Sequence, residues 1–283
     1  MFRSRGGGAA APPYLVPVRS SAFRRFGAFT HPGRINAERQ TQHNFQLSTF
    51  TPHGFTGVRM TSLLIATRNA HKVGEIRFIL GDGFKLSTLA DYVGSPQVAE
   101  DAATFEGNAR KKAEEIARWI QETQQNARNT PPTWVLADDS GLEVDALDGA
   151  PGVLSARFAA QETTTPGNSK DSENNAKLLR LLADVSGPRR MARFRCVMAL
   201  TRVPKAAGEL ETHFFDGVCE GQIGLEAQGG GGFGYDPLFF PLGSERSFAK
   251  IPRAEKNEMS HRALALAKLK KFFKRRASNP SGA

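Results

Sequence analysis

The chain has 283 residues, of which 40% are hydrophobic and two are cysteines, and its formal net charge is +10. This length suffices for one large domain or two modest ones, and the composition excludes a collagen-like or wholly disordered chain. No apolar run approaches the roughly 18 residues that a membrane-spanning helix needs, so we expect no membrane partner.

The positive charge lies at the two ends of the chain. Residues 1–59 contain eight arginines and a single acid, which gives +7, and residues 268–283 contain six Lys or Arg and no acid, which gives +6. The remaining residues therefore carry −3. This distribution argues against a duplex-binding face on the folded part and predicts no specific nucleic-acid partner, although a basic-tailed nucleic-acid-binding protein stays open as an alternative.

Residues 1–59 are rich in Gly, Pro, Ser and Arg and lack a sustained hydrophobic period, which predicts a disordered extension. Two explanations stay open: a transit peptide to a mitochondrion or plastid, and an upstream artefact before a true start at Met60. The second, slightly favoured, predicts a cytoplasmic protein. We expect one folded domain at 60–275 and a flexible tail at 276–283.

Apolar runs and helical spacing alternate from residue 62 onward. Thr104 is a candidate helix N-cap, and Cys196 and Cys219 lie in strand-like runs, which predicts buried, reduced thiols. The pattern predicts an α/β fold: a mixed twisted sheet with flanking helices, an antiparallel hairpin and a C-terminal helix. We expect strands at 62–67, 134–137, 193–203 and 211–223, and helices at 71–80, 104–122, 174–185 and 259–276.

The stretch TRNAHK, residues 67–72, lies between a predicted strand and a predicted helix. Free backbone N–H groups and the helix dipole favour a phosphate at such a turn, with Lys72 as a counter-charge. The stretch does not match the Walker A pattern. Ordinary helix capping by Thr67 and Asn69 is the alternative, and on this stretch alone it is favoured.

The stretch VLADDSG places Asp138 and Asp139 directly after an apolar run. Adjacent buried carboxylates are expected to raise each other's pKa unless a cation is present. Magnesium, which takes a few carboxylate oxygens and leaves other positions to water and phosphate, fits such a pair together with Glu100. Capping of a turn after the strand is an equally weighted alternative.

Two further polar stretches follow in the second half of the chain. GGGGFGYD, residues 229–236, lacks the preceding strand and following helix of a dinucleotide-binding turn, so we reject that interpretation. Its Phe233 and Tyr235 are suited to stacking on a flat base, or to anchoring a turn in the core. EKNEMSHR, residues 255–262, supplies donors for phosphate or a carbonyl oxygen, or the solvated start of a helix capped by Ser260.

In chain order, LLIATRNAHKVGEI, TFEGNARKKAEEIA, LADDSGLEVDALDGAPGVLSARF, GGFGYDPLFF and EKNEMSHR resemble the noncanonical purine nucleoside triphosphate pyrophosphatases, the inosine triphosphatase (Ham1-like) family, over about residues 62–273. The resemblance implies a homodimeric, magnesium-dependent catalytic domain that hydrolyses ITP, dITP and XTP to the monophosphate and pyrophosphate and so cleanses the nucleotide pool. A Maf-like nucleotide pyrophosphatase of other base specificity is the nearest rival, and FGYD and SHR count against it.

The resemblance also assigns roles to individual residues. By this resemblance, the triphosphate is bound by Thr67, Asn69, Lys72 and Lys112, and magnesium is held by Glu100 and Asp139. The attacking water is oriented or deprotonated by Asp139, with Asp138 close by. Ser140 contacts the substrate, and Arg157 lies near the site. The resemblance also implies that the base and ribose are bound by Phe233, Gly234, Tyr235 and Asp236. The 6-oxo edge of the purine is recognised by Lys256, His261 and Arg262. Two positions depart from the family pattern: Arg68 stands where Gly is common, and Gly107 where some members carry Glu.

Overall fold

The computed structural model describes residues 60–123, 132–162, 167–206 and 208–279. The extension predicted at 1–59 lies outside these residues. In the described part of the chain, no helix is both long enough and apolar enough to cross a membrane.

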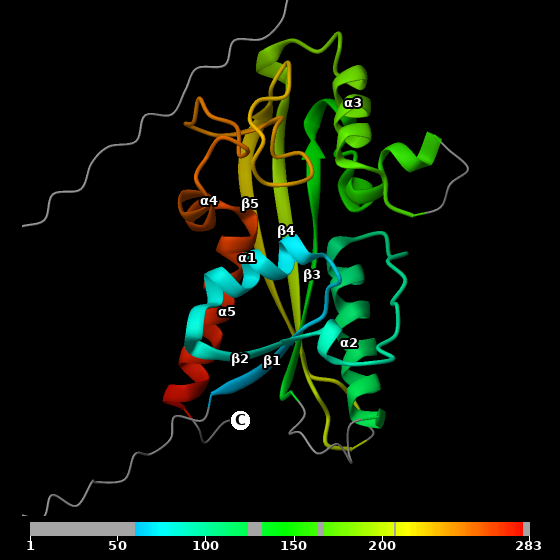
Figure 1. The fold of residues 1–283 in the computed structure, drawn as a ribbon, viewed down its shortest axis with the longest axis vertical. Helices are drawn as coiled ribbons and strands as arrows, with labels where there is room; N and C mark the ends of the chain where they lie inside the picture. The colour runs from blue at the N-terminus through cyan, green and yellow to red at the C-terminus, as the bar shows by residue number, and fades with distance from the viewer. Residues whose placement is uncertain (1–59, 124–131, 163–166, 207, 280–283) are drawn as a thin grey trace, which may run out of the picture. The chain divides into compact units, whose positions relative to one another are not determined.

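A six-stranded mixed sheet forms the centre of the described region, in the order β2-β1-β3-β4-β5-β6 (Figure 1). The strands are β1 (Thr61–Ile65), β2 (Phe84–Thr88), β3 (Trp134–Val144), β4 (Met191–Arg202), β5 (Thr212–Ile223) and β6 (Phe239–Pro241). β1 pairs in parallel with β2 and β3, whereas β3 to β6 pair antiparallel. The predicted fold class and the β4-β5 hairpin are therefore confirmed.

In the described part of the chain, five α-helices flank the sheet: α1 (Ala70–Leu80), α2 (Phe105–Thr123), α3 (Asp171–Leu181), α4 (Arg253–Met259) and α5 (His261–Ser278). Side chains cap three of these helices: Asn69 accepts from the first turn of α1, Thr104 from that of α2 and Ser260 from that of α5. The capping predictions are confirmed. α5 extends to Ser278, so the tail predicted to start at 276 begins in a helix.

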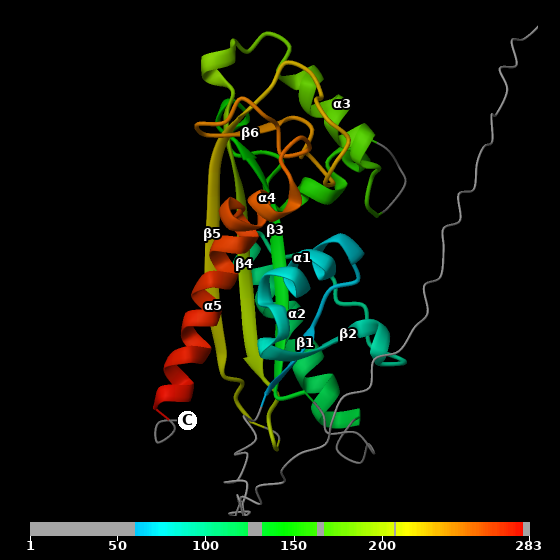
Figure 2. The ribbon, with the colours of Figure 1, turned by 60° about the vertical axis from the view of Figure 1, so that its left-hand side comes forward.

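Alternation along the long strands builds two apolar layers. Leu136 and Met198 pack with α1 and α5 on one face of the sheet, and Val135 and Ala137 pack with α2 on the other. Figures 1 and 2 show α3 and the segment around β6 at one end of β3, β4 and β5, beyond α1 and α2. The two cysteines are buried and free, as predicted.

The largest departure from the predicted elements concerns β3, which was expected to end at 137. The strand continues through the two aspartates to Val144, and all eleven of its residues pair with β4. The Asp-Asp-Ser-Gly stretch is therefore not a turn after a strand, and the capping alternative for the two aspartates is wrong. Backbone pairing with β4 overrides the turn propensity of these residues.

Candidate active site

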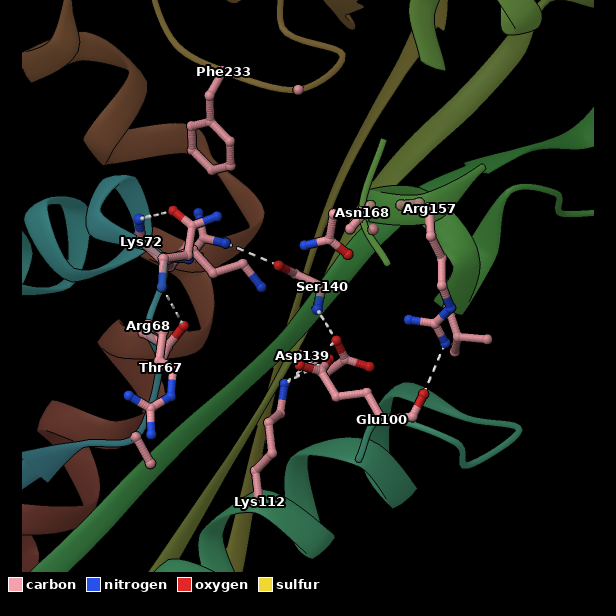
Figure 3. Close-up of a pocket in the computed structure, with 18 of the residues that line it drawn as sticks. Thr67, Arg68, Lys72, Glu100, Lys112, Asp139, Ser140, Arg157, Asn168 and Phe233 are labelled. Atoms are coloured by element: carbon pink, nitrogen blue, oxygen red, sulfur yellow. Dashed lines mark hydrogen bonds and ion pairs between the residues drawn. The ribbon is translucent and has the colours of Figure 1, made fainter. Parts of the chain in front are cut away.

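A cleft of about 830 Å³ opens between the β1–α1 turn, β3, the segment before α3 and the loop at 233–236 (Figure 3). The cleft brings together residues that lie up to 196 positions apart, from Ala66 to Arg262. Every predicted site residue except Asp138 lines it: Thr67, Asn69, Lys72, Glu100, Lys112, Asp139, Ser140, Arg157, Phe233, Gly234, Tyr235, Asp236, Lys256, His261 and Arg262.

The turn between β1 and α1 forms one wall of the cleft. The Asn69 side chain accepts hydrogen bonds from the backbone N–H groups of His71 and Lys72, and Thr67 Oγ1 accepts from the Asn69 N–H at 3.2 Å. Burial lowers the pKa of Lys72, but the charges of Asp138 and Asp139 and the hydrogen bond to Asp138 together outweigh burial, and the net shift is upward. Lys72 therefore places a fixed positive charge at this wall.

Two carboxylates and a lysine meet on the wall formed by β3 and α2. Lys112 Nζ lies 3.0 Å from Glu100 Oε2 and 3.7 Å from Asp139 Oδ1, and it donates to the backbone oxygen of Asp138 at 2.7 Å. Asn108 Nδ2 donates to Asp139 Oδ2 at 3.0 Å. Asp139 is thus held in place by groups from α2 while its carboxylate faces the cleft.

The environment of Asp139 favours its protonated form. Burial raises the pKa of Asp139, the charges of Lys112 and Lys72 offset part of that effect, and the nearby Glu100 carboxylate raises the pKa further. A carboxylate with a raised pKa is a stronger base than an ordinary aspartate. Asp139, buried and beside the Glu100 carboxylate, provides with Glu100 the chemistry of a divalent-cation site.

The donor set fits magnesium in particular. Among the described residues, no group of three or more His, Cys, Asp or Glu side chains lies close enough to hold a metal without further ligands. Magnesium commonly binds through one or two carboxylates and completes its shell with water and substrate phosphates. Glu100 and Asp139 are such a partial set, placed beside the cations that would meet a phosphate chain.

Asp138 differs from Asp139 in its contacts, in its position relative to the cleft and in the direction of its pKa shift. It is 1% exposed, does not line the cleft, and accepts hydrogen bonds from Lys72, Arg262 Nε at 3.1 Å and Ser140 Oγ at 3.2 Å. Burial raises its pKa, but the charges of Arg262 and Lys72 hold the pKa well below the usual range of aspartate. The expected mutual raising of the two pKa values is therefore wrong, because alternation along β3 sends the carboxylates to opposite faces of the sheet.

The loop 229–236 supplies the aromatic end of the cleft. It follows β5 at a distance and leads to β6 rather than to a helix, which confirms that it is no dinucleotide-binding turn. Asp236 Oδ2 accepts from the Phe233 backbone N–H at 2.9 Å and from Lys256 Nζ at 2.5 Å. Gly232 has φ of +72°, and a Cβ there would lie 1.9 Å from Asp236 Oδ2, so this turn requires glycine.

Both backbone groups of Gly234 are held by α3. The Gly234 N–H donates to Asp171 Oδ2 at 2.6 Å, and its carbonyl accepts from Asn175 Nδ2 at 3.1 Å. The Tyr235 hydroxyl donates to the Ser155 carbonyl at 2.9 Å. The predicted substrate residue Tyr235 therefore also anchors the loop, which fixes Phe233 at the mouth of the cleft (Figure 3).

The start of α5 contributes a neutral histidine. Burial, followed by the charge of Arg262, lowers the pKa of His261 well below its usual value, so the imidazole is uncharged at neutral pH. Its ring stacks on Phe194 with centroids 4.9 Å apart, and its Nδ1 has no hydrogen-bond partner among the described residues. His261 also lines the cleft, so this wall carries a neutral imidazole.

Glu75, which the sequence did not single out, organises two of the predicted donors. Its carboxylate pairs with Arg262 and lies 3.3 Å from Lys256 Nζ. Arg262 also donates to Asp138 and Ser140, which uses three of its five N–H groups and leaves two for other acceptors. The buried acids on this side thus stabilise two cations at the cleft wall.

The two departures from the family pattern leave the cleft intact. Arg68 is accommodated because its φ is not positive, so the position does not require glycine. Among the described residues, Asp148 is the one non-glycine residue with a positive φ. The Arg68 guanidinium donates to the Ser95 carbonyl at 2.8 Å. Gly107 donates to Thr104 in the first turn of α2 and does not line the cleft. Arg157 donates to the Glu100 carbonyl at 2.7 Å and so steadies that segment.

A family model described as the Ham1 family matches residues 63–272, which is most of the chain and includes every cleft residue discussed above. The chain belongs to the Ham1 family. A dITP/XTP pyrophosphatase from Exiguobacterium sibiricum is 45% identical over 208 residues, covering 73% of this chain and 94% of that protein. One from Geobacter sulfurreducens is 46% identical over 212 residues, covering 75% and 96%.

Solved structures of Ham1 proteins have the same fold. A HAM1 protein from Coxiella burnetii matches with a TM-score of 0.63 and 33% identity, over 76% of this chain and all of that one. The Ham1 protein of Staphylococcus aureus matches with a TM-score of 0.60 and 32% identity, over 75% and 97%. Membership of the Ham1 family favours the predicted family over the Maf-like alternative.

Several residues that shape the Ham1 cleft escaped the sequence prediction: Glu75, Asn108, Ser155, Asn168, Asp171 and Asn175. For two of them the sequence holds a signal, since Glu75 lies three residues after Lys72 and Asn108 four residues before Lys112 on predicted helices, hence on the same faces. Asn168, whose side chain points into the cleft in Figure 3, lies in an irregular segment with no such signal.

Proposed function

We propose that this protein hydrolyses noncanonical purine nucleoside triphosphates, with ITP, dITP and XTP as substrates, to the nucleoside monophosphate and pyrophosphate. The names of its relatives support the substrate class. The observation that carries the proposal is the layout of the cleft: Glu100, Lys112 and Asp139 lie toward one end, and the Phe233 ring lies at the other, with Lys256 and Arg262 beside it (Figure 3). A nucleoside triphosphate has the complementary layout of charge and flat base.

Glu100 and Asp139 would hold the magnesium ion, and Thr67, Asn69, Lys72 and Lys112 would receive the phosphate chain. When bound, magnesium neutralises charge on the phosphate oxygens and so favours attack on phosphorus. Lys72 and Lys112 add fixed positive charge that need not reorganise during the reaction. Arg157 supports the same end through its hydrogen bond to the backbone of Glu100.

Asp139 would also orient the attacking water and accept its proton, because its carboxylate is held by Asn108 and faces the cleft. A new P–O bond forms from the water oxygen, the bridging P–O bond between the α and β phosphates breaks, and pyrophosphate leaves with the electron pair. Asp138 is assigned a different role from the one first predicted: it holds Lys72 and Arg262 in position from beneath the cleft.

Base selection would come from Lys256, His261 and Arg262. Donors aimed at C6 pair with the carbonyl oxygen of hypoxanthine or xanthine, whereas the amino group of adenine would meet another donor. A buried site built for one hydrogen-bonding pattern rejects the opposite pattern strongly, because polar groups would be left unpaired. Phe233 would stack on the base, and Asp236 would fix the loop that carries Phe233.

The test is turnover of a nucleoside triphosphate panel with magnesium, with pyrophosphate and orthophosphate assayed separately. We expect pyrophosphate from ITP, dITP and XTP and little from ATP and GTP, and loss of turnover when a chelator removes the metal. Orthophosphate as the product, or equal rates across the panel, would overturn the proposal. A homodimer, a cytoplasmic location and the absence of nucleic-acid and membrane partners stay predictions.

A further inference from the structure

His71, in the first turn of α1, stacks on Phe233 of the loop 229–236. The ring centroids are 5.1 Å apart and the planes differ by 15°, which is an offset stack. The two residues lie 162 positions apart in the chain, and their rings form a contact between the phosphate-binding turn and the aromatic end of the cleft. The sequence assigned no role to His71.

His71 covers one face of the Phe233 ring. Phe233 lines the cleft and is half-buried, whereas His71 is exposed and does not line it. A ring stacked 5.1 Å from another leaves no room for a purine between them, since a base needs about 3.4 Å on each side of its plane. The face of Phe233 that does not contact His71 is therefore the one available to a base.

His71 is itself held by the turn that would receive phosphate. Its backbone N–H donates to Asn69 Oδ1 at 2.9 Å, and the next N–H, of Lys72, donates to the same oxygen. The imidazole thus projects from a capped first turn and has a defined position relative to Asn69 and Lys72. The loop that carries Phe233 is held separately, by Asp236 and by α3.

We propose that His71 is a positioning residue for base recognition: it backs the Phe233 ring, so that the ring presents its other face to the purine at a fixed distance from the phosphate-binding turn. This inference rests on the proposed function and deepens it. The stack makes base binding depend on the same turn that binds phosphate, and a substrate must fit both ends at once.

The proposal predicts a specific kinetic pattern for His71→Ala. The KM for ITP rises about three- to tenfold, the range expected for loss of one aromatic contact, while kcat changes little, because base binding is weakened equally before and during the reaction. Inhibition by inorganic tripolyphosphate, which has no base, stays unchanged. His71→Phe keeps the stack and restores the wild-type KM.

Arg77→Ala is the matched control, because Arg77 is exposed on the same helix and does not line the cleft. In the Phe233→Ala background, His71→Ala should have no further effect, since the ring that it supports is gone. An unchanged KM in His71→Ala overturns the proposal. A lower KM also overturns it, because that result means that the imidazole occupies the place of the base.

Calorimetric binding of IMP separates this proposal from the proposed function, because it needs no turnover. IMP should bind three- to tenfold more weakly to His71→Ala than to the wild type and with wild-type affinity to His71→Phe. If IMP binds more weakly to His71→Ala but the wild type releases no pyrophosphate from ITP, the role of His71 is retained and the proposed reaction is refuted. If the wild type releases pyrophosphate from ITP but IMP binds equally to all three proteins, the reaction is retained and the role of His71 is refuted.

Discussion

Asp138 and Asp139 are adjacent in the chain and lie in different electrostatic environments. Asp138 pairs with Lys72 of α1 and Arg262 of α5, whereas Asp139 contacts Asn108 and Lys112 of α2. Opposite shifts of the two pKa values follow, downward for Asp138 and upward for Asp139. Replacing each carboxylate by its amide should therefore give two different defects.

Asp138→Asn is expected to lower the free energy of unfolding by about 3–5 kcal/mol at pH 7, because it leaves Lys72 and Arg262 buried without their shared counter-charge. The folded pKa of Asp138 lies below the unfolded one, so its stabilisation is present above about pH 4 and is lost as the pH falls further. Urea unfolding at pH 7 and below pH 4 measures both effects. The wild type should lose more stability in acid than the variant.

Asp139→Asn is the matched comparison at the next position. Burial already disfavours the charge of Asp139, so the amide should keep the thermal midpoint near that of the wild type. Turnover of ITP should fall about 10²- to 10⁴-fold, the usual effect of removing a general base. An Asp139→Asn protein with near wild-type turnover would refute the assignment of the catalytic base.

Residue types and spacing were enough to predict which polar side chains gather at the cleft, because turns and helix starts expose donors and acceptors in recognisable patterns. They could not predict which carboxylate faces the cleft. That depends on whether Asp138 and Asp139 lie in a strand or a turn, and on partners such as Arg262, 124 residues away.

Among the elements, the contact between β5 and α5 positions the base-reading residues. Gly217 of β5 lies directly beneath the start of α5, and a Cβ at this position would be 2.0 Å from the His261 carbonyl oxygen and 2.7 Å from the Ala265 nitrogen. The close approach brings His261 and Arg262 to the cleft. The backbone of α5 lies directly against the backbone of β5 at Gly217, because glycine has no side chain to hold them apart.

Gly217→Ala is accordingly expected to displace α5 and to cost about 1–3 kcal/mol of stability, the usual range for overpacking. Discrimination between ITP and ATP should fall as well, because His261 and Arg262 move with the helix. Thermal unfolding and the ratio of kcat/KM values measure the two effects. Gly83→Ala, at a glycine with no heavy atom within 4 Å of the added Cβ, should change neither.

Most elements were predictable from apolar periodicity, whereas the short ones and some ends were not. β6 and α4 have three and seven residues, too few for a clear period, and β2 has no fully buried residue to mark it as an apolar run. β3 was predicted seven residues too short, because Asp, Ser and Gly are typical of turns. Pairing with β4 and ionic partners for Asp138 compensate for those propensities, and neither is visible locally.

On the scale of the whole molecule, the cleft is built from residues 66–262, and the family match covers 63–272. A protein of residues 60–283 should therefore keep the thermal midpoint of the full chain and its kcat/KM for ITP within about twofold. Parallel assays of the two proteins check this. A large loss of activity on removing 1–59 would show that the extension contributes to the site.

The order of helices and strands predicted the mixed sheet with flanking helices, and the motif order predicted the family. The convergence of four distant segments on one cleft could not be derived from periodicity, because strand order in a sheet depends on long-range pairing. β1 lies next to β3 rather than at an edge, and this pairing brings Thr67 and Lys72 to Asp139.

The most direct test of the account is a single competition reaction in which ITP and ATP are present at equal concentration with magnesium. The rates of consumption then give the ratio of the two kcat/KM values under identical conditions. We predict that ITP is converted to IMP and pyrophosphate at least about 100-fold faster than ATP is consumed, since the buried donors leave the adenine amino group unpaired. Consumption of both nucleotides at similar rates would contradict the account.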